Sequence, residues 1–194
     1  MGILLGFAPF IVFALLTSVS VSLGLWFAFA AAFVITIRDF VESPTLRLLD
    51  AGSVLLFGVL ALFTGFIEPS LTLSFVRLLV DAGFLGMALI SLALRRPVTR
   101  DYSHEHLPAE IRDTPAFLRT NYILTGAWAL AFAIMTAADT AGVFFARIPL
   151  SLDIAVGFAA LGLVIAFTVR FPAALAVRRS RREGAAGQTT PHKS

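Results

Sequence analysis

The sequence predicts an all-α protein, a polytopic transmembrane helical bundle of about six spans with both termini in the cytoplasm. Three observations lead to this prediction. The 194-residue chain is 58% hydrophobic and has a mean hydropathy of +0.90. Only 14% of its residues are charged, whereas a soluble domain carries roughly 25%. Apolar runs long enough to cross a bilayer alternate with short polar turns along most of the chain.

The first two predicted spans lie within one continuous apolar stretch, so the boundary between them has to be located. Residues 3–37 are too many for a single span of about 20 residues. A polar segment, 17–22, divides the stretch and predicts two helices, 3–18 and 21–38. The alternative is one long tilted helix, which would invert the topology of everything that follows.

The later spans begin at cap and turn residues. Ser43-Pro44 and Thr114-Pro115 each offer a hydroxyl for the N-cap, followed by proline at the first helical position. Glu68 opens a tight turn between the third and fourth spans. The six predicted spans are 3–18, 21–38, 44–67, 71–95, 115–142 and 150–171.

The basic residues set the predicted orientation. Of 15 basic residues, only Arg77 and Arg147 lie outside segments 38–47, 95–119 and 170–194, which a six-span topology places on one side. The positive-inside rule makes that side cytoplasmic, and the localisation is then a bacterial inner membrane. The same arrangement explains the sequence pI near 10.2 without a nucleic-acid partner. The tail, 173–194, is basic and predicted to be disordered.

The cytoplasmic arginines are expected to contact anionic lipid head groups or a membrane-protein partner, each contact with lipid contributing about 1 kcal/mol. These residues are Arg95, Arg96, Arg100, Arg178, Arg179, Arg181 and Arg182. His104 and His106 in the same loop form only a weak metal-binding pattern, so we expect no metal site. Small residues at four-residue spacing favour close helix packing and leave an oligomer possible.

Arg77 and Asp81 are the principal candidate site, because they lie four residues apart inside the fourth predicted span. A charge at that depth costs at least ~2.5–3.5 kcal/mol and needs a partner. In one interpretation the two side chains neutralise each other and lock helix packing. In the other, Asp81 faces a polar cavity and binds a proton, a cation or a polar head group.

Other polar residues complete the set of candidates. Asn121, Thr125 and Trp128 share one stripe of the fifth span, where they would either line that cavity or make interhelical hydrogen bonds. Asp50 is expected at the inner interface, paired with Arg47. The charged residues near the outer turns are expected to form a solvated rim. They are Glu68, Asp139, Arg147 and Asp153.

A weak repeat relates two of the charged segments. Arg47-Leu48-Leu49-Asp50-Ala51-Gly52 recurs, with one inserted residue, as Arg77-Leu78-Leu79-Val80-Asp81-Ala82-Gly83. The two copies would cross the membrane in opposite directions, an arrangement found in inverted-repeat transporters. A match this short in an apolar chain also arises by chance.

Three motifs carry a family resemblance. Leu5-Gly6-Phe7-Ala8-Pro9-Phe10-Ile11-Val12-Phe13, Arg95-Arg96-Pro97-Val98 and the aromatic segment 117–132 resemble the intracellular septation protein A family of bacterial inner-membrane proteins. The resemblance implies a role in envelope synthesis or septation through contacts with division and elongation proteins. It carries over no catalytic residue. That family often has asparagine three residues before the tryptophan, where this chain has Thr125.

Two functions therefore compete, and a third, an integral-membrane enzyme acting on lipid, ranks last because only loop 95–114 could supply its catalytic groups. The first is a non-enzymatic protein that acts through membrane-protein partners in envelope maintenance or septation. The second is a small proton-coupled transporter or channel that uses Arg77 and Asp81. We expect no enzyme activity and no cofactor, because the chain lacks cysteine, phosphate-loop and hydrolase motifs, and has no lysine or histidine in a predicted span.

Overall fold

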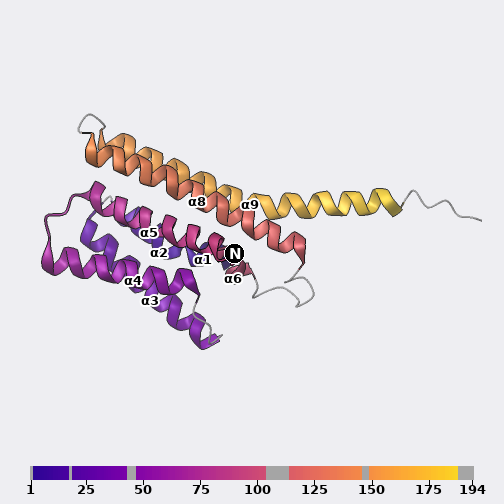
Figure 1. Ribbon diagram of the computed structural model, residues 1–194, viewed down its shortest axis with the longest axis horizontal. Helices are drawn as coiled ribbons and strands as arrows, with labels where there is room; N and C mark the ends of the chain where they lie inside the picture. Colours follow the sequence, from indigo (N-terminus) through magenta and orange to yellow (C-terminus); the bar gives the residue numbers. More distant parts are fainter. Residues whose placement is uncertain (1, 18, 43–46, 104–113, 146–148, 188–194) are drawn as a thin grey trace, which may run out of the picture.

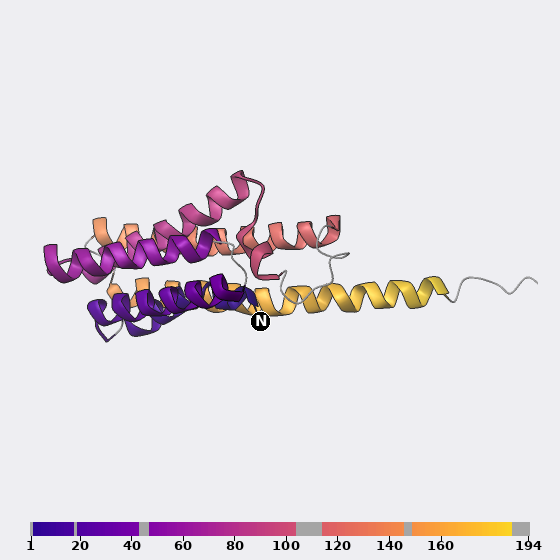
Figure 2. The same cartoon turned by 90° about the horizontal axis from the view of Figure 1, so that it is seen from below.

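The computed structural model describes residues 2–17, 19–42, 47–103, 114–145 and 149–187, with the side chains of these segments described from Leu4 to Pro172 (Figure 1). Every regular element in these segments is a helix, which confirms the predicted all-α class. The helices form a bundle of two layers. Figure 2 shows α4, α5 and α8 in one layer and α2, α3 and α9 in the other.

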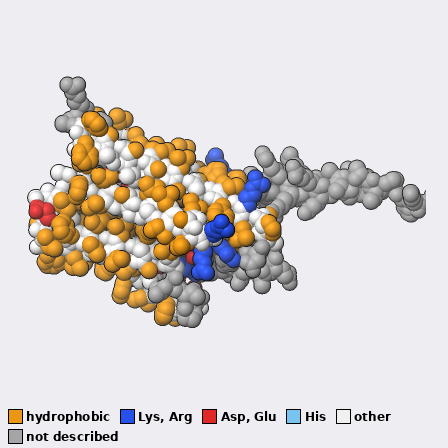
Figure 3. All heavy atoms as spheres, in the orientation of Figure 1, with side chains coloured by type: hydrophobic (Ala, Val, Ile, Leu, Met, Phe, Trp, Pro, Cys, Tyr) orange, Lys and Arg blue, Asp and Glu red, His pale blue; other side chains and the backbone are white. Residues whose placement is uncertain are grey.

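Five helices of the described segments are long and apolar enough to cross a membrane. Only 22–33% of the apolar window of each is buried within the bundle, so most of its apolar side chains face outward. Figure 3 shows hydrophobic side chains covering the visible length of the bundle. The protein is therefore a multi-pass membrane protein. These helices are α3 (Val21–Glu42), α4 (Leu48–Leu62) with its π-helical end η1 (Phe63–Ile67), α5 (Leu73–Ala93), α8 (Pro115–Phe144) and α9 (Leu150–Gly187).

The N-terminal segment forms two short helices, α1 (Gly2–Gly6) and α2 (Ala8–Leu16). The chain then turns and α3 packs back against α2, so the alternative of one long helix is wrong. The segment from α1 through α2 is about 22 Å long at 1.5 Å per residue, less than the ~30 Å hydrocarbon core. It nevertheless crosses most of the bundle, because α1 contacts α6 at one end and Thr17 lies beside Arg77 near the other.

Aromatic side chains of this short segment occupy the centre of the bundle. Phe7 stacks on Trp128 with ring centroids 3.7 Å apart, and Phe10 meets Phe84 and Phe132 edge-on at 5.2 and 4.9 Å. These rings are all at most 1% exposed. Each aromatic contact adds about 0.5–1.5 kcal/mol to the burial of area. The N-terminal segment is thus the core around which the longer helices pack.

Polar caps fix where several helices begin. Thr114 accepts a hydrogen bond from the backbone N–H of Phe117, and Pro115 follows at the first helical position, which confirms the predicted cap. Thr72 caps α5 in the same way. The Ser43-Pro44 cap lies outside the described residues.

The chain reverses after α5 in a tight left-handed turn. Arg95 has φ +56°. The backbone N–H of Arg96 bonds to the carbonyl of Ser91, which closes a Schellman motif. The short helix α6 (Val98–Ser103) follows, and its buried side chains Val98, Thr99 and Tyr102 seal this end of the bundle.

The exposed arginines of the described chain gather at this same end, which we call the arginine end (Figure 3). The N-terminus and the exit of α9 lie there too (Figure 1). The exposed arginines are Arg38, Arg95, Arg96, Arg119 and Arg170.

The predicted disordered tail needs correction. Helix α9 passes through Pro172 and continues to Gly187, well beyond the bundle (Figure 1). Alanine and arginine, which are frequent in 173–187, both favour helix. Residues 188–194 lie outside the described chain.

Helices α4 and α5 approach closely through two glycines. A Cβ atom at Gly52 would overlap the Sδ of Met87, and one at Gly83 would lie 2.7 Å from Cδ2 of Leu56. Two helices can pack this tightly only where one of them lacks a side chain.

We expect the double variants Gly52→Cys/Met87→Cys and Leu56→Cys/Gly83→Cys to form disulfides under mild oxidation, because a disulfide needs Cβ atoms about 3.5–4.5 Å apart. The chain has no native cysteine, so a mobility shift on non-reducing gels reports the bond directly. The control Leu56→Cys/Gly86→Cys should stay reduced, since a Cβ at Gly86 has no neighbour within 4 Å. Crosslinking of the control and not of the two pairs would refute this helix register.

Candidate functional site

Arg77 is buried and forms an ion pair across two helices. Its Nε lies 3.3 Å from Oδ1 of Asp139 on α8, and the two side chains are 11% and 0% exposed. Asp81, one turn further along α5, is also buried, as is Asp153 near the start of α9. The predicted pairing of Arg77 with Asp81 is therefore corrected, because the ion pair is made with Asp139. We call Arg77, Asp81, Asp139 and Asp153 the acidic-end cluster.

The predicted solvated rim also needs correction. Asp139 and Asp153 are 0% and 2% exposed. They are buried because α8 continues to Phe144, which places Asp139 inside the helix packing, while the Asp153 carboxylate lies against α8 beside Gly142. Of the other predicted rim residues, Glu68 is exposed, and Arg147 lies outside the described residues.

Among the described residues, the acidic-end cluster contains more carboxyl groups than the single guanidinium of Arg77 can satisfy. The carboxyl groups of Asp81 and Asp139 lie close enough for their charges to repel each other, and so do those of Asp139 and Asp153. Oδ2 of Asp81, Oδ2 of Asp139 and both oxygens of Asp153 are buried with no hydrogen-bond partner in the described chain. Buried carboxylate oxygens without a partner are costly, so this arrangement favours an added positive charge.

A cavity adjoins the cluster. Arg77, Asp81 and Thr17 contribute polar atoms to its wall, and Phe10 and Met135 contribute apolar surface. Its volume of about 20 Å³ exceeds the ~10–15 Å³ that one water requires. The cavity can thus bring a water to the carboxyl group of Asp81.

Glycine at position 157 makes room for the guanidinium. A Cβ built on Gly157 of α9 would lie 2.7 Å from Nη2 of Arg77. Any side chain here would push the Arg77 head group out of its place opposite Asp139. Three long helices, α5, α8 and α9, therefore position one buried cation.

Asn121, Thr125 and Trp128 do not join this cluster, since they lie more than ~15 Å away along α8. Thr99 of α6 donates to the Asn121 carbonyl at 2.9 Å, and its Oγ1 is 2.9 Å from that of Thr125. Trp128 Nε1 donates to Thr168 of α9 at 3.1 Å. The stripe therefore makes the interhelical hydrogen bonds that were the alternative to cavity lining.

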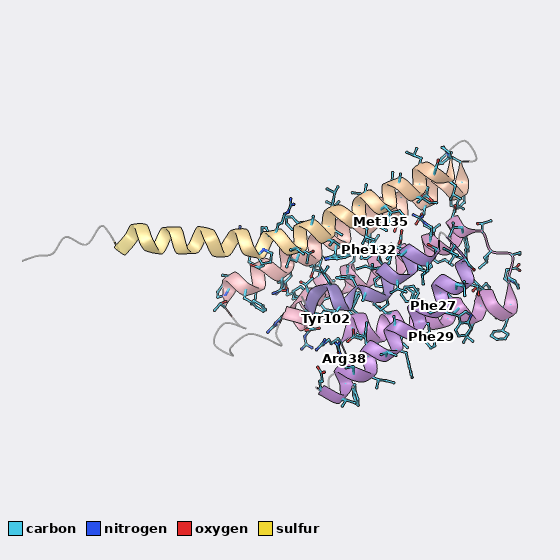
Figure 4. All side chains as sticks on the ribbon, turned by 180° about the vertical axis from the view of Figure 1, so that it is seen from behind. Phe27, Phe29, Arg38, Tyr102, Phe132 and Met135 are labelled. Atoms are coloured by element: carbon cyan, nitrogen blue, oxygen red, sulfur yellow. The ribbon has the colours of Figure 1, made fainter. Side chains whose placement is uncertain are left out.

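A second buried cluster lies at the arginine end. Nη1 of Arg47 is 2.7 Å from Oδ2 of Asp39 on α3, so its ion pair is with Asp39, whereas Asp50 was expected. The Tyr102 hydroxyl donates a hydrogen bond to Oδ1 of Asp50, and the Arg47 guanidinium lies 4.8 Å above the Tyr102 ring. We call Asp39, Arg47, Asp50 and Tyr102 the arginine-end cluster. Figure 4 labels Tyr102 and the neighbouring Arg38.

Tyr102 is held rigidly in this cluster. A Cβ at Gly6 of α1 would lie 2.6–2.8 Å from three atoms of its ring, so the backbone of α1 packs directly on the ring. Burial, and next the Asp50 carboxylate, raise the pKa of the Tyr102 hydroxyl above its usual 10.0. Tyr102 therefore stays protonated and remains a donor throughout the physiological range.

The arginines predicted to contact lipid head groups differ in their exposure and in whether their side chains are described. Arg95 and Arg96 are exposed, and Arg100 is half-buried. The side chains of Arg178, Arg179, Arg181 and Arg182 lie outside the described residues, although their backbone belongs to α9. His104 and His106 are also outside the described part of the chain.

No protein-family model, curated protein or solved structure matches this chain. The resemblance to the septation protein family is therefore still a prediction.

We expect Arg77→Leu to destabilise the protein by about 3–5 kcal/mol, because it removes the one cation that the described residues place in this buried cluster. Arg77→Leu/Asp139→Leu should recover part of this loss, since it removes one carboxyl group as well. Unfolding of the purified protein in detergent measures both effects. The exposed control Arg119→Leu should change the unfolding free energy by less than about 0.5 kcal/mol. An Arg77→Leu variant as stable as that control would show that the ion pair contributes nothing.

We also expect the unfolding free energy to fall as the pH rises above about 10. The unfolded chain then loses the Tyr102 proton at its ordinary pKa of 10.0, while the folded protein keeps it. Stability contributed by this raised pKa is complete below 10 and is lost as the pH approaches the folded value. Tyr102→Phe should remove this component of the pH dependence, whereas Tyr122→Phe should retain it. Identical alkaline profiles for the wild type and Tyr102→Phe would contradict the assignment.

Proposed function

We propose that the protein is a small proton-coupled membrane transporter or channel and that the acidic-end cluster binds the proton. One observation carries the proposal. Asp81, Asp139 and Asp153 are buried around Arg77, and four of their carboxylate oxygens have no hydrogen-bond partner in the described chain. Buried polar groups are normally paired, so such a surplus of acceptors is typical of a site that takes up a cationic ligand.

The geometry favours a proton over a larger ligand. The cavity beside Asp81 holds about 20 Å³, enough for one water and too little for an organic solute. A proton added to one carboxyl group lets it donate a hydrogen bond to a neighbouring carboxylate, which pairs two acceptors at once. Arg77 then balances a remaining carboxylate. Binding, and not catalysis, is the role that these groups support, so we keep the expectation of a non-enzymatic protein.

The distribution of exposed arginines suggests the membrane and the orientation of the protein in it. We propose a bacterial inner membrane, with the arginine end in the cytoplasm. The acidic-end cluster then lies near the periplasmic surface. Arg95 and Arg96 are exposed at the cytoplasmic face, where they would contact anionic head groups.

Asp81→Asn tests the proposal in proteoliposomes. With a membrane potential imposed, the wild type should carry protons into vesicles that contain a pH-sensitive dye, and Asp81→Asn should lower that rate at least tenfold. Infrared difference spectra of the wild type between two pH values should show a protonated carboxyl band that Asp81→Asn removes. Glu68→Gln, which changes an exposed carboxyl group, is the matched control and should retain both signals. Unchanged flux and an unchanged band in Asp81→Asn would refute the proposal.

The extension of α9 favours a second candidate, action through a membrane-protein partner in envelope maintenance or septation. This helix continues beyond the bundle to Gly187 and includes four arginines between 178 and 182. A partner role predicts that deletion of residues 174–194 abolishes co-purification of division proteins and leaves proton flux intact. Loss of flux on this deletion, with no change in co-purifying proteins, would exclude this second role.

A further inference from the structure

The sequence repeat has a counterpart in space. Asp50-Ala51-Gly52 on α4 and Asp81-Ala82-Gly83 on α5 are 31 residues apart. At the contact between these helices, Gly52 faces Met87 and Gly83 faces Leu56. Leu56 and Met87 are also separated by 31 residues. Adding 31 to the residue on α4 and subtracting 31 from the residue on α5 therefore turns the Gly52–Met87 contact into the Gly83–Leu56 contact. The 31-residue offset that aligns the two copies in sequence thus also relates α4 to α5 by a local two-fold axis.

The arginines of the two copies are 30 residues apart, because the inserted residue follows Arg77, but their pairing is similar. In each copy an arginine near the start of the helix forms a buried ion pair with an aspartate of another helix. Arg47 pairs with Asp39 of α3 at 2.7 Å, and Arg77 pairs with Asp139 of α8 at 3.3 Å. Because α4 and α5 are antiparallel, the two pairs lie at opposite ends of the bundle.

Each copy also holds a second, buried aspartate that is not the arginine's ion-pair partner. Asp50 is 5% exposed and Asp81 is 2% exposed. Asp81 adjoins the cavity of the acidic end. Asp50 accepts a hydrogen bond from the hydroxyl of Tyr102, which lies on α6, the helix that seals the arginine end.

We propose that the chain is an inverted duplication in which Asp50 is a second proton-binding carboxyl group, serving the arginine side of the membrane as Asp81 serves the opposite side. This inference rests on the proposed proton-coupled function. A proton bound at one carboxyl group passes to the other through water when the intervening core opens. The aromatic cluster of Phe7, Phe10, Phe84, Trp128 and Phe132 keeps the two sites apart in this structure.

A second polar group points to water at the Asp50 site. Ser53 follows Asp50 by three residues on α4 and so shares its helix face. Its hydroxyl is buried, at 1% exposure, and has no hydrogen-bond partner in the described chain. A water bound here would complete the hydrogen bonding of this hydroxyl. The proton path from Asp50 would therefore continue along α4 toward the centre of the bundle.

The charged groups around Asp50 make it suitable for reversible proton binding. Arg47 stabilises its carboxylate, whereas Asp39 on α3 and Asp101 on α6 repel it. Tyr102 donates a hydrogen bond to the ionised form. Displacement of α6 would remove the Tyr102 donor and open Asp50 to the arginine side.

The first experiment compares carboxyl variants of the full-length protein in proteoliposomes. Asp50→Asn should lower the proton flux at least tenfold and remove one protonated carboxyl band, and Asp81→Asn should do the same at the other site. Glu42→Gln, an exposed carboxyl at the end of α3, is the matched control and should leave flux unchanged. Full flux in Asp50→Asn together with lost flux in Asp81→Asn would overturn the second site and leave the proposed function standing. Full proton flux in both Asp50→Asn and Asp81→Asn would refute the proposed function itself.

The second experiment does not depend on the stability of Asp50→Asn. Thr17→Cys places a thiol in the cavity wall at the acidic end, and Ser53→Cys places one beside Asp50. Silver ions, which bind thiols and are close to water in size, should label Thr17→Cys only from the acidic side and Ser53→Cys only from the arginine side, in oriented vesicles. Labelling of both from one side, or no labelling of Ser53→Cys from either side, would overturn the inference.

Discussion

Hydrocarbon offers no partner to a charge, and this constraint organises the whole molecule. A charged side chain inside the bilayer must find its counter-charge within the protein or reach an interface. The chain does both, with Arg77 paired to Asp139 near one end and Arg47 paired to Asp39 near the other. Between them the bundle is packed with aromatic rings. The two charged clusters are therefore separated by an apolar core, as the proposed proton-coupled function requires.

Small residues make these buried pairs possible. Gly157 leaves space for the Arg77 guanidinium, and Gly6 lets the first helix pack on the Tyr102 ring. Gly52 and Gly83 bring α4 and α5 together. Close packing restricts each charged side chain to one arrangement, so its partner is fixed by the helix contacts and not by distance along the sequence. A single methyl group at Gly157 would disturb an ion pair made by two other helices.

The short N-terminal segment links core and site. Its rings fill the centre of the bundle, and it ends at Thr17, in the wall of the cavity beside Asp81. Its first helix, α1, contacts α6, and Tyr102 on α6 donates a hydrogen bond to Asp50. A small shift of this segment would thus affect both charged clusters. Such coupling requires a continuous chain of packed contacts, which the aromatic cluster provides.

Apolar run length, helix caps and the distribution of arginine determined the all-α membrane bundle from the sequence, because these signals are local. Sequence reasoning also identified Arg77 and Asp81 as buried charges. It missed Asp139 and Asp153 as their neighbours, and assigned Arg47 to Asp50 in place of Asp39. Only the tertiary structure decided these partners, since Asp139 is 62 residues from Arg77 along the chain and the two meet through helix packing. Adjacency on one helix can be counted along a sequence, whereas contacts between helices depend on how their surfaces fit.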